Sequence, residues 1–220
     1  MKKDQKTRIT RNVGSEPGGK TPLGLRVIGG TLRGSKLKYS GDNRVRPMKD
    51  RTREAVFNLI STDSQGACVL DLFAGTGALA IEAISRGATS ATLIEVHLQT
   101  MRNLKLNIEA FGLQAKCQLL QGDAFFFAKT RESMATMATL PGQHWLVFCS
   151  PPYDFYVSRQ EEMIEMIETL YAAAPVGSTF VVEADRRFDF HRLQLPNADA
   201  RFRTYSPAEI AIYRKLRNPE

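Results

Sequence analysis

From residue 67 onward, two hydrophobic patterns alternate along the chain. Short runs of consecutive apolar residues are typical of strands that are buried on both faces of a parallel sheet. Between these runs, apolar residues recur three or four positions apart, which predicts helices that bury one face. The alternation predicts an α/β fold, with helices on both faces of a mostly parallel sheet. The expected strands are CVLDLF, ATLIEV, CQLLQGD, WLVFCS and TFVVEAD.

Helices are expected between these strands. The segment ALAIEAISRGA ends at Arg86 and Gly87, a cation followed by a glycine that lets the chain leave the helix. Residues 98–111 form the next expected helix, and Ser158 with Glu161 predicts a capping box at the start of a later one. The apolar positions of this later helix, which we expect to face the sheet, are Met163, Ile164, Ile167 and Leu170.

The N-terminal quarter has a different pattern. LRVIGGTLRGSKLKYS contains two short alternating runs around turn glycines, which predict a small basic hairpin. RVRPMKDRTREAVFNLI follows, and Pro47 suits the start of a helix. Arg51 and Arg53 are expected on the open side of that helix. Its expected inner face carries Val56, Phe57 and Ile60.

These patterns divide the chain into three parts. Residues 1–24 form a basic tail that we expect to be disordered, residues 25–62 form the hairpin and helix, and residues 63–220 form the sheet domain. The sheet domain ends in RFRTY and EIAIYRK, which predict an antiparallel pair at the sheet edge.

Positive charge is concentrated at the N-terminal end. The formal net charge is +7, yet the first 53 residues hold 15 Lys and Arg against 4 Asp and Glu, while the remaining residues hold 15 against 19. A charged tail is more often solvated than bound, but from Arg26 onward the charges alternate with apolar residues, as in a folded basic face. Such a face attracts a phosphate backbone. The candidate contacts are Arg26, Arg33, Arg46 and Arg53.

Other residue types narrow the range of functions. The apolar stretches are too short to span a bilayer and no export signal follows the charged start, so we expect a cytoplasmic protein. The cysteines Cys68, Cys117 and Cys149 form no CxxC pair, and the three histidines show no ligand spacing, so we expect no metal site. No interface pattern is apparent, and we expect a monomer.

The segment VLDLFAGTG carries the strongest chemical pattern, because a buried strand runs into a glycine turn and then a helix. Gly75 and Gly77 would allow the turn and the close approach of a ligand. Glu95 follows Asp71 by 24 residues, where such folds place an acceptor for ribose hydroxyls. A dinucleotide is the alternative ligand, but Asp71 just before the turn suits a cofactor with a cationic methionine part better than a pyrophosphate.

Gly122, Asp123 and Ala124 end the third expected strand, at the same sheet edge. The Asp123 carboxylate could accept a hydrogen bond from an adenine amine. It could equally cap the following helix.

The segment Ser150-Pro151-Pro152-Tyr153 ends the fourth expected strand. Two prolines cannot continue a central strand, so the chain must turn outward at the carboxyl edge. The Pro151 carbonyl and the Ser150 side chain could accept hydrogen bonds from an amine, while Tyr153 stacks on an extruded base. A turn of purely structural use is the alternative.

Over residues 26–215 the chain resembles the bacterial small-subunit ribosomal RNA guanine-N2 methyltransferases of the RsmD type. The most specific segments are RVIGGTLRGSKL, RPMKDRTREAVFNLI and VLDLFAGTGALAIEAISRGA. The resemblance implies a Rossmann-like S-adenosylmethionine-dependent methyltransferase fold, in which a mostly parallel seven-stranded sheet has an antiparallel last strand. It also implies S-adenosylmethionine as methyl donor and a guanine in 16S ribosomal RNA, free or within the small-subunit particle, as acceptor.

The resemblance also implies roles for individual residues. Residues of the glycine turn would hold the methionine and ribose parts of the cofactor, Glu95 the ribose hydroxyls, and Asp123 with Ala124 the adenine. The turn residues are Asp71, Phe73, Gly75 and Gly77. The residues expected near the junction of RNA and cofactor are Arg46, Asp50, Arg53 and Glu54.

Position 150 departs from this family, which usually has Asp before the two prolines, whereas this chain has Ser150. A hydroxyl accepts a weaker hydrogen bond from the amine than a carboxylate does. Two alternatives therefore stay open. One is amine methylation elsewhere, on cytosine N4 or adenine N6 of DNA or on a protein side-chain amide. The other is an RNA-binding protein with reduced catalysis.

Overall fold

The computed structural model of the chain describes residues 24–39, 47–130 and 143–218. Residues 1–23, 40–46, 131–142 and 219–220 lie outside the described residues. The expected tail and the candidate RNA contact Arg46 fall there.

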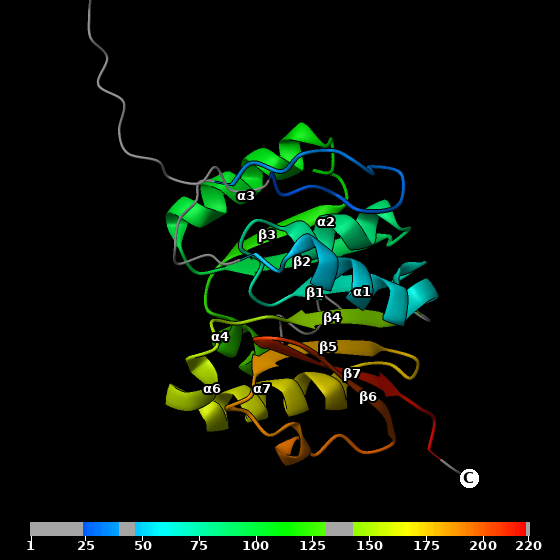
Figure 1. The fold of residues 1–220 in the computed structure, drawn as a ribbon, viewed down its shortest axis with the longest axis vertical. Helices are drawn as coiled ribbons and strands as arrows, with labels where there is room; N and C mark the ends of the chain where they lie inside the picture. Colours follow the sequence, from blue (N-terminus) through cyan, green and yellow to red (C-terminus); the bar gives the residue numbers. More distant parts are fainter. Residues whose placement is uncertain (1–23, 40–46, 131–142, 219–220) are drawn as a thin grey trace, which may run out of the picture.

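The described residues form a mixed sheet of seven strands in the order β3-β2-β1-β4-β5-β7-β6 (Figure 1). Neighbours from β3 to β5 pair in parallel, whereas β7 is antiparallel to both β5 and β6. The predicted α/β fold, its five expected parallel strands and the antiparallel pair at the edge are confirmed. The strands are β1 (Cys68–Asp71), β2 (Ser90–Glu95), β3 (Cys117–Gln121), β4 (Trp145–Cys149), β5 (Thr179–Asp185), β6 (Ala198–Tyr205) and β7 (Ala208–Lys215).

Helices cover both faces of the sheet because alternate residues of the central strands point to opposite sides. In β4, Phe148 belongs to the apolar core under α1, α2 and α3, while Cys149 belongs to the core under α4, α6 and α7 (Figure 1). The helices are α1 (Asp50–Ile60), α2 (Ala78–Ser85), α3 (Leu98–Ala110), α4 (Ala124–Lys129), α6 (Phe155–Ser158) and α7 (Gln160–Ala173), with short 3-10 turns η1 (Ser61–Ser64) and η2 (Phe190–Arg192). None of the helices in the described ranges has the length and apolar character that a membrane span requires.

The start of α7 differs from its prediction. Ser158 ends α6 and donates its hydroxyl hydrogen bond to the Asp154 carbonyl, so it does not cap α7. Arg159 occupies the capping position, and its guanidinium pairs with Glu162. The expected capping box is therefore wrong. The inner face is largely confirmed: Met163, Ile167 and Leu170 are buried, and Ile164 is partly buried against the same core.

The N-terminal segment folds back on itself and packs on α2. Its two arms meet at a single antiparallel bridge between Arg26 and Lys36, rather than as a regular hairpin. Leu25, Val27 and Leu37 are buried in the core that α1 and α2 share. This segment therefore forms part of the same core as the sheet.

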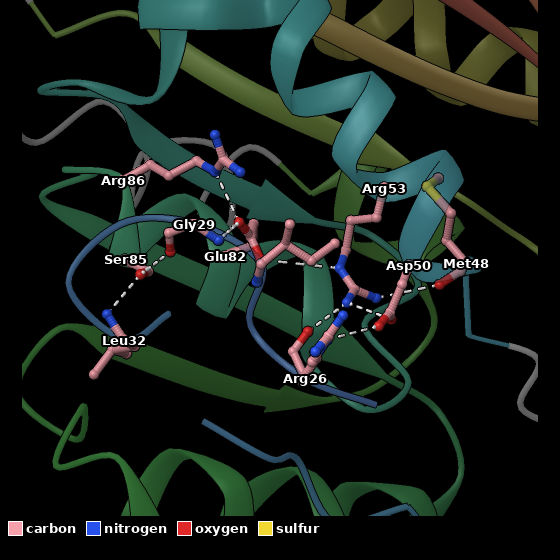
Figure 2. A network of polar contacts seen from close by, with 10 residues as sticks. Arg26, Gly29, Leu32, Met48, Asp50, Arg53, Glu82, Ser85 and Arg86 are labelled. Carbon is pink, nitrogen blue, oxygen red and sulfur yellow. Dashed lines mark hydrogen bonds and ion pairs between the residues drawn. The ribbon is translucent and has the colours of Figure 1, made fainter. Parts of the chain in front are cut away.

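A buried polar network fastens this segment to the fold, and Figure 2 shows it at close range. Arg53, expected on the open side of α1, is fully buried and donates to the carbonyls of Met48 and Arg26 at 3.2 and 2.5 Å. It also pairs with Asp50 at 2.9 Å. Glu82 of α2 lies 4.0 Å from Arg53 Nε and is itself fully buried. The expected exposure of Arg53 is wrong, because its guanidinium supplies the donors that satisfy buried carbonyls.

Glu82 completes the network from the other side. Its carboxylate accepts hydrogen bonds from the Ile28 and Gly29 N–H groups, both at 2.7 Å, and from Arg86 at 2.8 Å. Ser85 adds a donor to the Gly29 carbonyl. The RVIGGTLRGS segment is thus held by backbone contacts to α2, which leaves the side chain of Arg26 largely exposed.

Candidate active site

A cavity of about 450 Å³ opens at the carboxyl edge of the sheet. The chain moves outward from β1 in both directions, to β2 on one side and to β4 on the other. Such a switch point leaves a crevice between the loops that follow the two strands. The cavity is lined by the turn after β1, the ends of β2 and β5, the segment after β4, the start of α1 and the β6–β7 turn.

The cavity brings together part of the predicted site. The predicted site residues that line the cavity are Phe73, Gly75, Glu95, Ser150, Pro151, Pro152 and Tyr153. The predicted site residues that do not line the cavity are Asp71, Gly77, Asp123, Ala124, Arg26, Arg33 and Arg53.

Glu95 organises the glycine turn. Its Oε2 accepts the Gly75 N–H at 3.0 Å, and its Oε1 accepts the His97 N–H at 2.8 Å. Gly75 has a left-handed φ of 53°, which favours glycine. The carboxylate therefore holds the turn after β1 and the start of α3 in one arrangement, and Glu95 also lines the cavity.

Gly77 meets a packing constraint that the sequence did not predict. It has a φ of 79°, and a Cβ at this position would lie 2.5 Å from Leu104 Cδ1 of α3. The close neighbour is thus the protein core rather than a ligand. The left-handed φ agrees with the expected turn, helix packing adds a second constraint, and close approach of a ligand at Gly77 stays a prediction.

Asp71 is the most deeply buried carboxyl group among the predicted site residues. The residue is 1% exposed, and neither carboxylate oxygen has a hydrogen-bond partner of normal geometry among the described residues. Burial raises the pKa of Asp71 to about 7, an effect that the backbone amides of Ala80 and Phe73 partly oppose and the charge of Glu95 reinforces. A cation brought near this carboxylate would favour its ionised form.

Asp123 caps α4, as the structural alternative predicted. Its Oδ1 accepts the Phe125 N–H at 2.8 Å. Its other oxygen lies 3.7 Å from Arg159, whose guanidinium also stacks on the Phe125 ring at 3.7 Å. Contact between Asp123 and an adenine stays a prediction.

The segment after β4 meets an unexpected partner. Ser150 Oγ donates a hydrogen bond to Glu183 Oε2, and Tyr153 Oη donates one to Glu183 Oε1 at 2.7 Å. Glu183 lies in β5, is 6% exposed and lines the cavity. The signal that could have indicated it was a carboxylate inside the apolar run TFVVEAD.

Two further segments line the cavity. The resemblance placed the segment of α1 near the cofactor through Asp50, Arg53 and Glu54, but none of these three lines the cavity, and the β6–β7 turn was not predicted. Before and in α1, Pro47, Met48, Lys49 and Thr52 line the cavity. On the other side, Tyr205, Pro207 and Ala208 of the β6–β7 turn line it. The segment around the start of α1 and the C-terminal pair of strands therefore both contribute to the opening. Only the tertiary fold brings these distant segments together.

Residues 25–214 match the model of a protein family described as "Conserved hypothetical protein 95". The chain belongs to this family. The match covers the N-terminal segment as well as the sheet.

Named members and solved structures resemble the chain at moderate identity. "Ribosomal RNA small subunit methyltransferase D" of Escherichia coli is 36% identical over 144 residues, which cover 66% of this chain and 67% of that protein. "Putative rRNA methyltransferase YlbH" of Bacillus subtilis is 28% identical over 87% of this chain and 99% of its own length. The solved structure of "Putative methyltransferase yhhF" from Escherichia coli superposes with a TM-score of 0.66 at 26% identity, covering 88% of this chain and 98% of that one.

Proposed function

We propose that this family member transfers a methyl group from S-adenosylmethionine to the exocyclic N2 amine of a guanine in small-subunit ribosomal RNA. The observation that carries the proposal is that one cavity is lined both by the turn after β1 and by the Ser150–Tyr153 segment. The printed names of its relatives, which describe methyltransferases of ribosomal RNA, support the same reaction and substrate class.

The residues fit the cofactor. The Gly75 turn and Glu95 offer a backbone loop and a ribose-hydroxyl acceptor at the cavity wall. Asp71 offers a buried carboxylate just before the same turn, and a nearby cationic methionine part would favour its ionised form. When bound, S-adenosylmethionine supplies an electrophilic methyl group on a positively charged sulfur. Phe73 lines the same wall. Asp123 and Ala124 lie at the start of α4 and do not line the cavity, and their contact with the adenine stays a prediction.

The chain's own residues orient the acceptor. The Ser150 hydroxyl and the Pro151 carbonyl accept hydrogen bonds from the amine, which leaves the nitrogen lone pair free to react. Tyr153 and the prolines form an apolar wall against the base. Alignment and exclusion of water are sufficient to accelerate this reaction, since no covalent intermediate with the protein is needed. A base reaches such a cavity only by leaving its stack, at a cost of a few kcal/mol.

Basic residues near the cavity and on the N-terminal segment bind the phosphate backbone of the RNA. Arg26 and Arg33 are exposed on the N-terminal segment, and Lys49 lines the opening of the cavity. Arg53 is left out of this surface because it is buried. We propose ribosomal RNA or the small-subunit particle as partner, bound by a monomer.

Methyl transfer from radiolabelled S-adenosylmethionine tests this function. Purified protein is incubated separately with small-subunit ribosomal RNA, small-subunit particles, duplex DNA and a protein fraction. We expect label in the RNA or the particles. Label in DNA or protein alone would replace the proposed acceptor, and cofactor binding without transfer to any fraction would contradict the enzymatic function.

A further inference from the structure

A carboxylate stands beside the amine-binding segment although position 150 carries no charge. In the parallel pair of β4 and β5, Cys149 is opposite Val182. The next residues along each strand, Ser150 and Glu183, therefore lie side by side at the carboxyl edge. Their hydrogen bond confirms this placement.

Both hydroxyl groups of the segment donate to Glu183. Ser150 Oγ donates to Oε2, and Tyr153 Oη donates to Oε1 at 2.7 Å. The residue is 6% exposed, so little water competes for these bonds. Among the described residues no Lys or Arg forms an ion pair with Glu183, and its carboxylate oxygens accept hydrogen bonds from the two hydroxyls.

We propose that Glu183 is the carboxylate of the amine site and acts on the acceptor through Ser150 and Tyr153, an inference that rests on the proposed amine methylation. An ionised carboxylate can only accept, so it fixes the direction of both hydrogen bonds. The Ser150 proton is committed to Glu183, and only lone pairs of Ser150 Oγ face an incoming amine. Ser150 is thereby set as an acceptor, and the adjacent negative charge strengthens the hydrogen bond that it accepts.

The same arrangement accounts for the proton that the reaction releases. The amine nitrogen uses its lone pair to form the bond to the methyl carbon, and the electron pair of the broken carbon–sulfur bond remains on sulfur. The nitrogen, now positively charged, gives one proton to Ser150 Oγ as the Ser150 hydroxyl proton moves to Glu183 Oε2. Glu183 then returns that proton to water. Glu183 is a positioning residue and proton acceptor, while Ser150 makes the contact with the amine.

Moving the charge between the two positions tests the inference. Glu183→Gln keeps the shape and removes the charge. Ser150→Asp places a second carboxylate against Glu183, and like charges in contact disfavour one another. The double variant Ser150→Asp with Glu183→Gln again has one carboxylate, now one strand away. Glu209→Gln of β7 is the matched control, because this carboxylate does not line the cavity.

For each full-length variant, kcat and KM for small-subunit RNA are measured, together with the Kd of S-adenosylhomocysteine by calorimetry. We expect Glu183→Gln and Ser150→Asp each to lose about 10- to 100-fold in kcat, with the Kd of S-adenosylhomocysteine changed less than about twofold. The kcat of the double variant should recover to within about fivefold of the wild-type value. The kcat of Glu209→Gln should equal the wild-type value. The Kd also reports whether each variant is folded.

The outcomes separate this inference from the function on which it rests. If the wild type methylates RNA and Glu183→Gln retains its kcat, or if the double variant is no better than the single ones, Glu183 has no such role. If the wild type methylates no RNA, the proposed function fails and this inference fails with it.

Discussion

Replacing Arg53 with methionine tests whether this arginine holds the N-terminal segment or binds RNA. Methionine fills similar space but removes the donors to the Met48 and Arg26 carbonyls and the charge beside Glu82. Breaking a buried ion pair by removing one partner costs about 3 to 5 kcal/mol. For a chain of this size each kcal/mol corresponds to roughly 2 to 4 °C, so we expect the Tm to fall by roughly 6 to 20 °C.

The assay pairs urea unfolding with RNA binding at a temperature where the variant is folded. Arg51→Met is the matched control, because Arg51 lies on the same helix but is exposed, and it should change stability by less than about 0.5 kcal/mol. Folded Arg53→Met should bind RNA within about twofold of the wild type, with the same salt dependence. An unchanged unfolding free energy together with a weaker, less salt-dependent RNA affinity would refute the structural role of Arg53.

Three further predictions concern Gly77, Asp71 and Glu95, which lie in or beside the turn after β1. Gly77→Ala should lower the free energy of unfolding in urea by about 2 to 4 kcal/mol, because it combines a left-handed φ with a Cβ 2.5 Å from Leu104 Cδ1. The control Gly112→Ala, at a φ of 65° with open space around the Cβ, should lower it by about 1 to 2 kcal/mol. Equal costs would contradict the packing argument. Since the folded pKa of Asp71 is raised to about 7, the folded state binds its proton more tightly than the unfolded state, and this group lowers stability as pH rises through about 4 to 7. Asp71→Asn should therefore reduce the stability lost between pH 5 and 8 by roughly 3 kcal/mol in urea unfolding, and an unchanged pH dependence would contradict the raised pKa. Glu95→Gln should weaken S-adenosylhomocysteine binding about tenfold by calorimetry while leaving RNA affinity unchanged, and full retention of cofactor affinity would remove Glu95 from the site.

The sequence predicted those features that depend on local pattern. Each expected strand formed. The runs of β1 and β4 are buried on both faces, as consecutive apolar residues predict, whereas β3 at the sheet edge is only partly buried. The turn after β1 and the exit at Pro151 and Pro152 also lie where predicted, since glycine and proline restrict the backbone locally. These features gave the fold and placed the cofactor turn and the amine segment at one edge.

Features that depend on tertiary contacts were missed or wrong. The helical pattern of α1 could not show that Arg53 is buried, because the carbonyls that it satisfies belong to residues brought there by the fold. Glu183 stood in an expected strand, but its pairing with Ser150 depends on the register between β4 and β5. The substitution at position 150 therefore looked like a lost charge until the neighbouring strand was in place.

Mass spectrometry of nucleosides from small-subunit ribosomal RNA, after incubation with the protein and S-adenosylmethionine, tests the central claim most directly. The account predicts that N2-methylguanosine appears with the wild type and falls about 10- to 100-fold in rate with Glu183→Gln. A methyl group on another base, or no modified nucleoside although the protein binds the cofactor, would contradict it.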